Sequence, residues 1–223
     1  MIMTIWFASG NIHKKKELSD ILSAKRTSDG NVRFDLRLPS EAGFAFDPDE
    51  TGNTFLENAL IKAEALYRLL LEKGVMRHGE PVIADDSGIC VDSLDGRPGI
   101  YSARYGMSAH GTLSDTGRNA LLLAELGDNP TRSARFVCAM VLYYSPNRFF
   151  AAQESLEGEL VPNEKAARGS GGFGYDPILY IPGLGRTVAE LDAEEKNRLS
   201  HRAKAGMAIA GFLLTNHQHG GPC

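Results

Sequence analysis

One apolar run constrains the fold more than any other feature of this sequence. Residues 134–144, ARFVCAMVLYY, are almost continuously apolar. Such a run is typical of a strand that is buried on both faces, because a strand with one wet face carries polar residues at alternate positions. We therefore expect residues 134–144 to lie inside a sheet, with residues 149–156 as a neighbouring strand.

Further elements follow from the spacing of the other apolar residues. Thr54 with Glu57 forms a capping-box pattern in front of an amphipathic stretch. The predicted helices cover residues 13–22, 55–73 and 113–126, and two more begin near residues 192 and 200. The predicted strands cover residues 3–8, 32–38, 81–84 and 178–181, and an acidic turn at residues 85–88 leads into another short strand. Strands and helices alternate irregularly, which favours an α/β layered fold with a mixed sheet.

The composition is that of a globular chain, with 43% hydrophobic and 23% charged residues in 223. We expect a single domain over residues 1–214 and a mobile tail over residues 215–223. The net charge is −4 and the two signs are interleaved, so nucleic acid is not favoured as a partner. No apolar run reaches the length of a bilayer span, no signal peptide is evident, and the cysteines lack metal-type spacing. These features favour a cytoplasmic protein without membrane contact.

The segment Ser9-Gly10-Asn11 lies where a predicted strand gives way to a helix. Free backbone N–H groups and the helix dipole make such a junction a candidate anion site, and Lys14 follows in the first turn. The alternative is a plain helix cap with a solvated lysine face, which is the commoner arrangement for such a segment.

Asp85 and Asp86 are adjacent carboxylates at the end of a predicted buried strand. Their repulsion requires compensation, and Mg²⁺ is a natural partner because it takes one or two carboxylates and completes its shell with phosphate oxygens. Glu50 is a further candidate ligand. A turn cap at Asp85-Asp86 and a helix-start charge at Glu50 are the structural alternatives.

Residues 169–174, GSGGFG, match the dinucleotide-binding pattern GxGxxG but lack its context. No strand precedes them and Pro177 follows too soon for a helix to open. A loop that presents Phe173 and Tyr175, with Asp176 beside them, to a nucleobase fits better. For Lys196, His201 and Arg202, spacing alone favours a solvated helix face.

Five segments in order resemble the Ham1 and RdgB family of inosine/xanthosine triphosphate pyrophosphatases. They are ASGNIHKKKEL, DETGNTFLENALIKAEAL, ADDSGICVDSLDGRPGIYSARY, GSGGFGYDPILY and EKNRLSHR, which together span residues 8–202. The resemblance implies an elongated mixed sheet with flanking helices, two lobes around a central substrate cleft, and a homodimer. Two features depart from the family: Ser9 stands where Thr is usual, which keeps the hydroxyl, and residues 26–46 and those after Leu214 do not match in detail.

The resemblance also implies roles for individual residues. Asp86 is the expected base, and it binds Mg²⁺ together with Glu50, with Asp85 as a further candidate ligand. The triphosphate contacts Ser9, Gly10, Asn11, Ile12, His13 and Lys14. Ser87 would touch the substrate, and the nucleoside pocket would be lined by Phe173, Gly174, Tyr175 and Asp176. The base and the phosphates would be contacted by Lys196, His201 and Arg202. The implied reaction is hydrolysis of ITP, dITP and XTP to the monophosphate and pyrophosphate. Two alternatives are a pyrophosphatase for another modified nucleotide and a nucleotide-binding sensor without catalysis.

Overall fold

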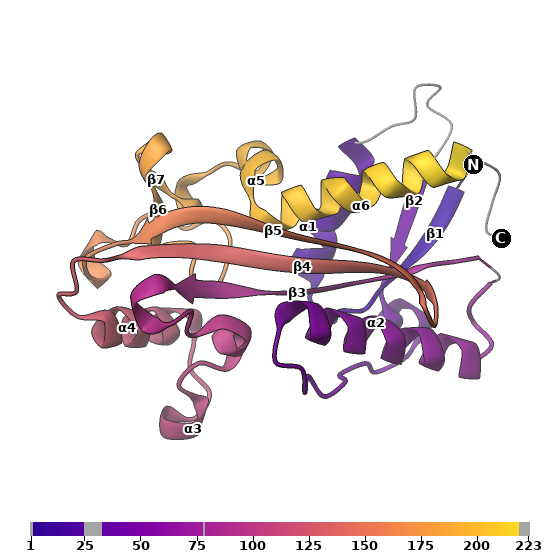
Figure 1. Ribbon diagram of the computed structural model, residues 1–223, viewed down its shortest axis with the longest axis horizontal. Coiled ribbons are helices and arrows are strands. Elements are labelled where there is room, and N and C mark those ends of the chain that lie inside the picture. The colour runs from indigo at the N-terminus through magenta and orange to yellow at the C-terminus, as the bar shows by residue number, and fades with distance from the viewer. Residues whose placement is uncertain (1, 25–32, 78, 219–223) are drawn as a thin grey trace. The chain divides into compact units, whose positions relative to one another are not determined.

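Within residues 2–24, 33–77 and 79–218, which a computed structural model describes, seven strands form one mixed sheet. The strands are β1 (Ile2–Phe7), β2 (Arg33–Arg37), β3 (Val82–Val91), β4 (Ser133–Ser145), β5 (Arg148–Leu160), β6 (Leu179–Ile181) and β7 (Arg186–Thr187) (Figure 1). Their order is β2-β1-β3-β4-β5-β6-β7. β1 pairs in parallel with β2 and β3, whereas β6 pairs antiparallel with β5 and β7. The predicted mixed sheet is confirmed.

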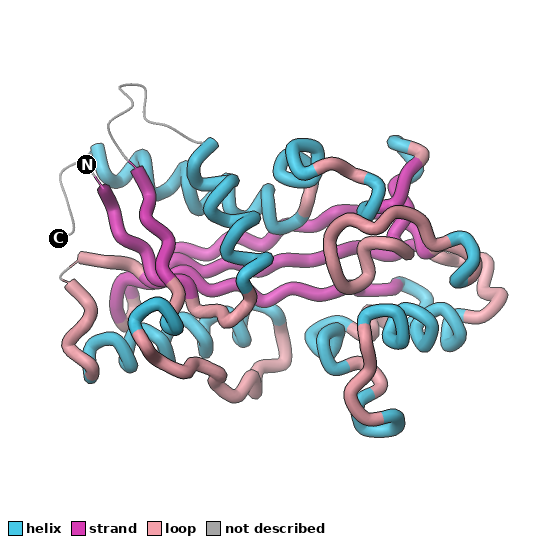
Figure 2. The backbone as a smooth tube through the Cα atoms, turned by 180° about the vertical axis from the view of Figure 1, so that it is seen from behind, coloured by secondary structure: helices cyan, strands magenta, loops and turns pink. Residues whose placement is uncertain are grey.

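The helices agree with the predicted ones in number and approximate position, apart from one added short helix. They are α1 (Ile12–Ala24), α2 (Phe55–Glu72), α3 (Met107–His110), α4 (Asp115–Leu126), α5 (Ala193–Leu199) and α6 (His201–Gln218). Short 3-10 helices are η1 (Pro39–Ala42), η2 (Asp92–Leu94), η3 (Gly99–Arg104), η4 (Glu164–Ala166), η5 (Pro182–Leu184) and η6 (Val188–Glu190). Residues 43–54 connect η1 to α2 without helix or strand (Figure 2).

The chain forms two compact units. The first unit holds residues 1–86, 138–154 and 202–223, and the second holds residues 87–137 and 155–201. The boundaries fall within β3, β4 and β5, so each of these strands contributes residues to both units. The predicted single domain and its cleft between two lobes stay predictions.

The core of the first unit shows why its strands are apolar on both faces. Side chains alternate along a strand, so Ile5 of β1 and Cys138 of β4 join α1 and α6, whereas Trp6 and Val141 join α2. Figure 1 shows α1 and α6 on one side of these strands and α2 on the other. The unbroken apolar run in β4 therefore reflects helices on both faces, as the sequence predicts.

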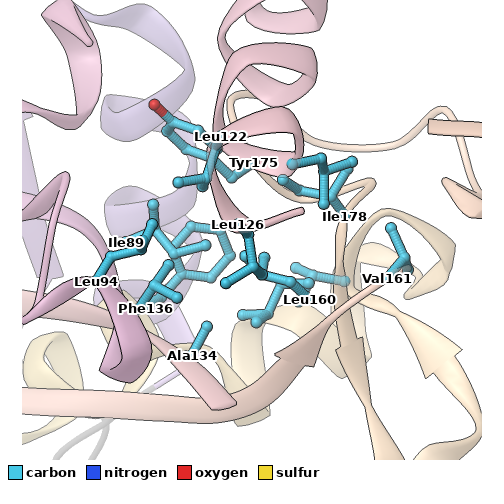
Figure 3. Close-up of a cluster of buried hydrophobic side chains, with 14 of the residues drawn as sticks. Ile89, Leu94, Leu122, Leu126, Ala134, Phe136, Leu160, Val161, Tyr175 and Ile178 are labelled. Carbon is cyan, nitrogen blue, oxygen red and sulfur yellow. The ribbon is translucent and has the colours of Figure 1, made fainter. Parts of the chain in front are cut away.

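The core of the second unit packs α4 against the other ends of the same strands. Leu122 and Leu126 of α4 meet Ile89 of β3, Phe136 of β4 and Leu160 of β5 in one buried cluster (Figure 3). Burial of such side chains contributes about 1.5–3 kcal/mol each relative to exposure. This cluster also includes Tyr175, which anchors the glycine-containing loop that precedes β6.

One prediction about the chain's course is wrong, and the predicted mobile tail stays a prediction. Residues 85–88 are not a turn, because β3 continues through them to Val91 without reversing direction. The helix at the C-terminal end passes residue 214 and reaches Gln218, where Thr215 and Asn216 donate to carbonyls one turn earlier in α6. The rest of the predicted tail, residues 219–223, lies outside the described residues. In the described part of the chain, no helix is long and apolar enough to cross a membrane.

Candidate functional site

The two adjacent carboxylates of β3 are separated by the pleat of the strand. Asp85 and Asp86 are 1% and 7% exposed, and as neighbours in a strand they point to opposite faces. The face of Asp85 carries α1 and α6, and the face of Asp86 carries α2. Each carboxylate therefore meets its own set of cations.

Asp85 lies in a buried ion-pair network. The Nζ of Lys14 lies 3.0 Å from Asp85 Oδ2, and the Nε of Arg202 donates to the same oxygen at 3.2 Å. Arg202 also donates through Nη1 to Glu17 Oε2 at 2.6 Å. Burial alone would raise the pKa of Asp85, but the charges of Lys14 and Arg202 lower it far below the ordinary value. Asp85 is thus held as an anion.

Asp86 has weaker compensation. Asn58 donates to its Oδ2 and Lys62 to its Oδ1, both at 3.2 Å, and Lys62 also contacts Glu50 Oε1 at 2.7 Å. Burial raises the pKa of Asp86, the charge of Glu50 raises it further, and Lys62 with Asn58 opposes them only in part. The carboxyl of Asp86 is therefore more basic than an ordinary aspartate.

Lys62 and Asn58 are site residues that were not singled out from the sequence. They are one turn apart on α2 and are buried, at 8% and 0% exposure, beside the alanines that line the apolar face of the helix. Polar residues at positions i and i+4 within an apolar stripe are the signal that could have found them. Burial would lower the pKa of Lys62, but Asp86, Asp85 and Glu50 raise it, so Lys62 stays charged.

The segment before α1 is a helix cap built by side chains. Asn11 Oδ1 accepts from the N–H groups of His13 at 2.9 Å and Lys14 at 3.2 Å, and Ser9 Oγ accepts from Asn11 N–H at 3.0 Å. Cap formation, the structural alternative, is therefore realised. The predicted solvated lysine face does not hold for Lys14, whose side chain is 17% exposed and paired with Asp85.

The donor set for a divalent cation in the first unit consists of the carboxylates of Glu50 and Asp86. Both contact the Lys62 ammonium, so they already converge on one positive group. No cluster of three or more metal-binding side chains occurs among the described residues. Mg²⁺ binds through one or two carboxylates and shares the rest of its shell with water and phosphate, so this oxygen pair suits it.

In the second unit, the glycine-rich loop holds Phe173 by contacts around its backbone. Asp176 Oδ2 accepts from Phe173 N–H at 2.9 Å and from the Nζ of Lys196 at 2.9 Å. The same Nζ lies 5.0 Å from the centre of the Phe173 ring, in a cation–π contact. At Gly172 a Cβ would lie 1.9 Å from Asp176 Oδ2, so a side chain there would displace the carboxylate. Phe173, Asp176 and Lys196 thus form one group, which joins the predicted loop to a residue for which spacing alone favoured a solvated helix face.

The sequence predicts that Tyr175 presents its ring to a nucleobase, but the ring is buried. It is 4% exposed, packs in the core of the second unit, and donates through its hydroxyl to Ser102 O at 2.8 Å. His201 is also buried and stacks on Phe136 at a centroid distance of 4.9 Å. Neither lies on the solvated surface that spacing alone favours for His201.

The predicted group of Lys196, His201 and Arg202 is divided between the units. Lys196 and His201 belong to the second unit, and Arg202 to the first. Ser87 follows Asp86 in β3 and is half-buried. Glu17, which pairs with Arg202, is a further residue that the sequence did not single out.

The chain is similar to known proteins over most of its length. A family model described as Ham1 family matches residues 5–212. A dITP/XTP pyrophosphatase of Treponema denticola is 45% identical over 212 residues, covering 95% of this chain and 98% of that protein. One from Geobacillus kaustophilus is 48% identical over 203 residues, covering 90% and 89%. The solved structure of the Staphylococcus aureus Ham1 protein matches with a TM-score of 0.77 and 35% identity, covering 96% of this chain and 99% of that one. This chain belongs to the Ham1 family.

Proposed function

We propose that this chain hydrolyses ITP, dITP and XTP to the nucleoside monophosphate and pyrophosphate, with Mg²⁺ as cofactor. The relatives named above as dITP/XTP pyrophosphatases support this substrate class. The observation that carries the chemistry is the carboxylate pair of β3. One member is locked as an anion by two cations, and the other is buried with a raised pKa.

The first unit would take the triphosphate and the metal. Lys14 supplies a positive charge at the cap formed by Ser9 and Asn11, where backbone N–H groups favour phosphate oxygens. Gly10, Ile12 and His13 complete the proposed phosphate segment. Glu50 and Asp86 would hold Mg²⁺, which neutralises charge on the phosphate oxygens when it is bound.

Asp86 would act as the base on the attacking water. Without a metal, burial and the charge of Glu50 raise the pKa of Asp86, and a bound Mg²⁺ would oppose that shift and keep the carboxylate ionised as a base must be. As the water oxygen bonds to the α-phosphorus, Asp86 takes its proton and the bond from that phosphorus to the bridging oxygen breaks. Pyrophosphate leaves with the electron pair of that bond.

Asp85 would have a different task from Asp86. Both of its oxygens accept from Lys14, and one also accepts from Arg202, so its charge is already neutralised. We assign it to holding these two cations in place and not to metal binding. This assignment corresponds to the structural role that the sequence left open for the acidic pair.

The second unit would take the purine base. Phe173 would stack on it, the backbone of residues 173–176 would line it, and Lys196 would donate to it. The 6-keto oxygen of hypoxanthine or xanthine accepts a hydrogen bond, whereas the 6-amino group of adenine would leave such a donor unpaired. Ser87, His201 and Arg202 complete the proposed contacts to substrate, and a cytoplasmic homodimer is the proposed form of the enzyme.

Pyrophosphate release from a panel of triphosphates tests this function. We expect rapid release from ITP, dITP and XTP, much slower release from ATP, dUTP and dTTP, and loss of activity when EDTA removes the metal. Faster release from dUTP or dTTP than from ITP would show that the substrate is a pyrimidine nucleotide and not a purine one. Binding of ITP without pyrophosphate release at saturating magnesium would indicate a sensor.

A further inference from the structure

The loop that carries Phe173 is tied to the first two turns of α4 at a single residue, Gly174. Asp115 Oδ2 accepts from Gly174 N–H at 2.7 Å, and Asn119 Nδ2 donates to Gly174 O at 3.1 Å. Asp115 and Asn119 are four residues apart on α4, so they lie on the same side of the helix. We call this pair the α4 clamp.

Further contacts at the start of α4 hold Asp115 of the α4 clamp in place. Arg118 pairs with the other carboxylate oxygen of Asp115 and donates to Leu113 O at 2.6 Å. Ser114 caps the helix by accepting from Gly117 N–H at 3.1 Å. Asn119 is 7% exposed. Side chains fixed in this way transmit their position to the group they bind.

Side chains bind the backbone at Phe173 and at Gly174, the residue that follows it. Gly174 has a φ of +63°, a left-handed conformation that other residues rarely adopt. Asp176 holds the N–H of Phe173, and the α4 clamp holds the N–H and carbonyl of Gly174. Three backbone groups, at Phe173 and at the residue after it, are therefore bound by side chains, so the backbone that carries the ring is restrained.

We propose that Asp115 and Asn119 are positioning residues that fix the ring of Phe173 for stacking on the purine base. This inference rests on the proposed function, because Phe173 has a stacking role only if a nucleotide is the substrate. It adds residues of α4 to the specificity machinery, although their side chains bind the loop and not the substrate.

The test compares Asp115→Ala and Asn119→Leu with two controls. Thr116→Ala alters an exposed residue of the same turn. Asp115→Asn keeps an oxygen that accepts from Gly174 N–H, and so should rescue the loss caused by alanine. Phe173→Ala shows how far the KM rises when the base stack is lost completely. Removing an aromatic base stack costs about 1–3 kcal/mol, or roughly fivefold to a hundredfold in binding.

For Asp115→Ala and Asn119→Leu we expect the KM for ITP to rise about tenfold, within the range of a lost base stack, with kcat changed less than threefold. Inorganic tripolyphosphate, a competitive inhibitor without a base, should keep the Ki of the parent. Asp115→Asn and Thr116→Ala should stay within about twofold of the parent in KM, well below a lost stack. The split between ITP and tripolyphosphate is a readout that a merely structural role would not produce.

Three outcomes would overturn the proposal or its basis. An unchanged KM for ITP with a lower Tm would show that the α4 clamp stabilises the fold but does not position Phe173 for substrate. A tripolyphosphate Ki that rises in step with the KM would indicate general damage to the protein, and would also reject base positioning. A parent that neither hydrolyses nor binds ITP would overturn the proposed function first, and that result is visible before any variant is compared.

Discussion

The charged set of the first unit and the aromatic set of the second are held by different means. In the first unit, Lys14, Lys62 and Asp85 project from regular helices and strands and are fixed by ion pairs. In the second unit, Phe173 lies on an irregular loop whose backbone is bound by Asp176 of the same loop and by Asp115 of α4. Removing a side chain should therefore leave an uncompensated buried charge in the first unit, but only a displaced loop in the second.

Two neighbouring residues of β3, Asp85 and Asp86, also differ in how the structure treats their charge. Asp85 and Asp86 are neighbours, yet the structure shifts the pKa of Asp85 down and that of Asp86 up. A carboxyl with a lowered pKa in the folded chain stabilises the fold when ionised, and one with a raised pKa does the opposite. One carboxylate thus contributes to stability when it is ionised, and the other, the proposed base, reduces it.

The largest expected effect follows from Asp86→Asn. Turnover of ITP should fall about 100-fold or more, because the base is lost together with one proposed metal ligand. The free energy of unfolding should not decrease, since the folded chain disfavours the charge that the substitution removes. Steady-state kinetics and urea denaturation measure the two quantities. Turnover within about threefold of the parent would reject Asp86 as the base, given the size of a typical general-base contribution.

Asp85→Asn should behave in the opposite way. The free energy of unfolding should fall by roughly 3–5 kcal/mol, as when one partner of a buried ion pair is removed. Lys14 and Arg202 would then be left without their shared anion. Urea denaturation with Asp86→Asn as the matched neighbour checks this. Equal stability of the two variants would refute the division of roles between the two carboxylates.

Lys14→Ala should weaken both substrate binding and the fold. We expect the KM for ITP to rise about tenfold and the free energy of unfolding to fall by about 2 kcal/mol, because Asp85 loses a charged hydrogen-bond donor. Lys16→Ala is the control, since Lys16 is exposed and pairs only with Asp20 in the contacts described, a pair worth about 0.3–0.5 kcal/mol. An altered KM without any loss of stability would show that the Lys14–Asp85 pair contributes nothing to the fold.

The smallest effect belongs to the second unit. Tyr175→Phe removes one hydrogen bond to Ser102 O and keeps the buried ring, so the free energy of unfolding should fall by about 1 kcal/mol. Tyr101→Phe serves as the control because Tyr101 is exposed. Differential scanning calorimetry of both variants provides the comparison. A loss as large as that of Asp85→Asn would mean that the two units do not differ as described.

Periodicity alone predicted most of the secondary structure. The apolar run of β4 lies between helices on both faces, and α2 begins after Thr54 as the capping pattern indicates. The capping box itself forms only in part: Thr54 accepts from Glu57 N–H, but Glu57 accepts from Asn53 N–H and not from Thr54. These features are local, so a window of a few residues is enough to specify them.

The acidic pair shows what such a window lacks. Two adjacent aspartates followed by Ser and Gly favour a turn by propensity, yet β3 runs straight through them. Cations from α1 and α6 neutralise Asp85, and Lys62 from α2 lies against Asp86. Those partners lie 24 to 117 positions away in the sequence, beyond any local pattern.

By itself, the sequence determined most of the helices and strands and, through five ordered motifs, which family the chain resembles. Only the tertiary structure decided that Asp85 and Asp86 face opposite sides of a strand, that Lys62 joins Glu50 to Asp86, and that Tyr175 lies in the core. The physical reason is that secondary structure depends on near neighbours along the chain. The protonation and pairing of a buried charge depend on groups that meet only when helices and strands pack together.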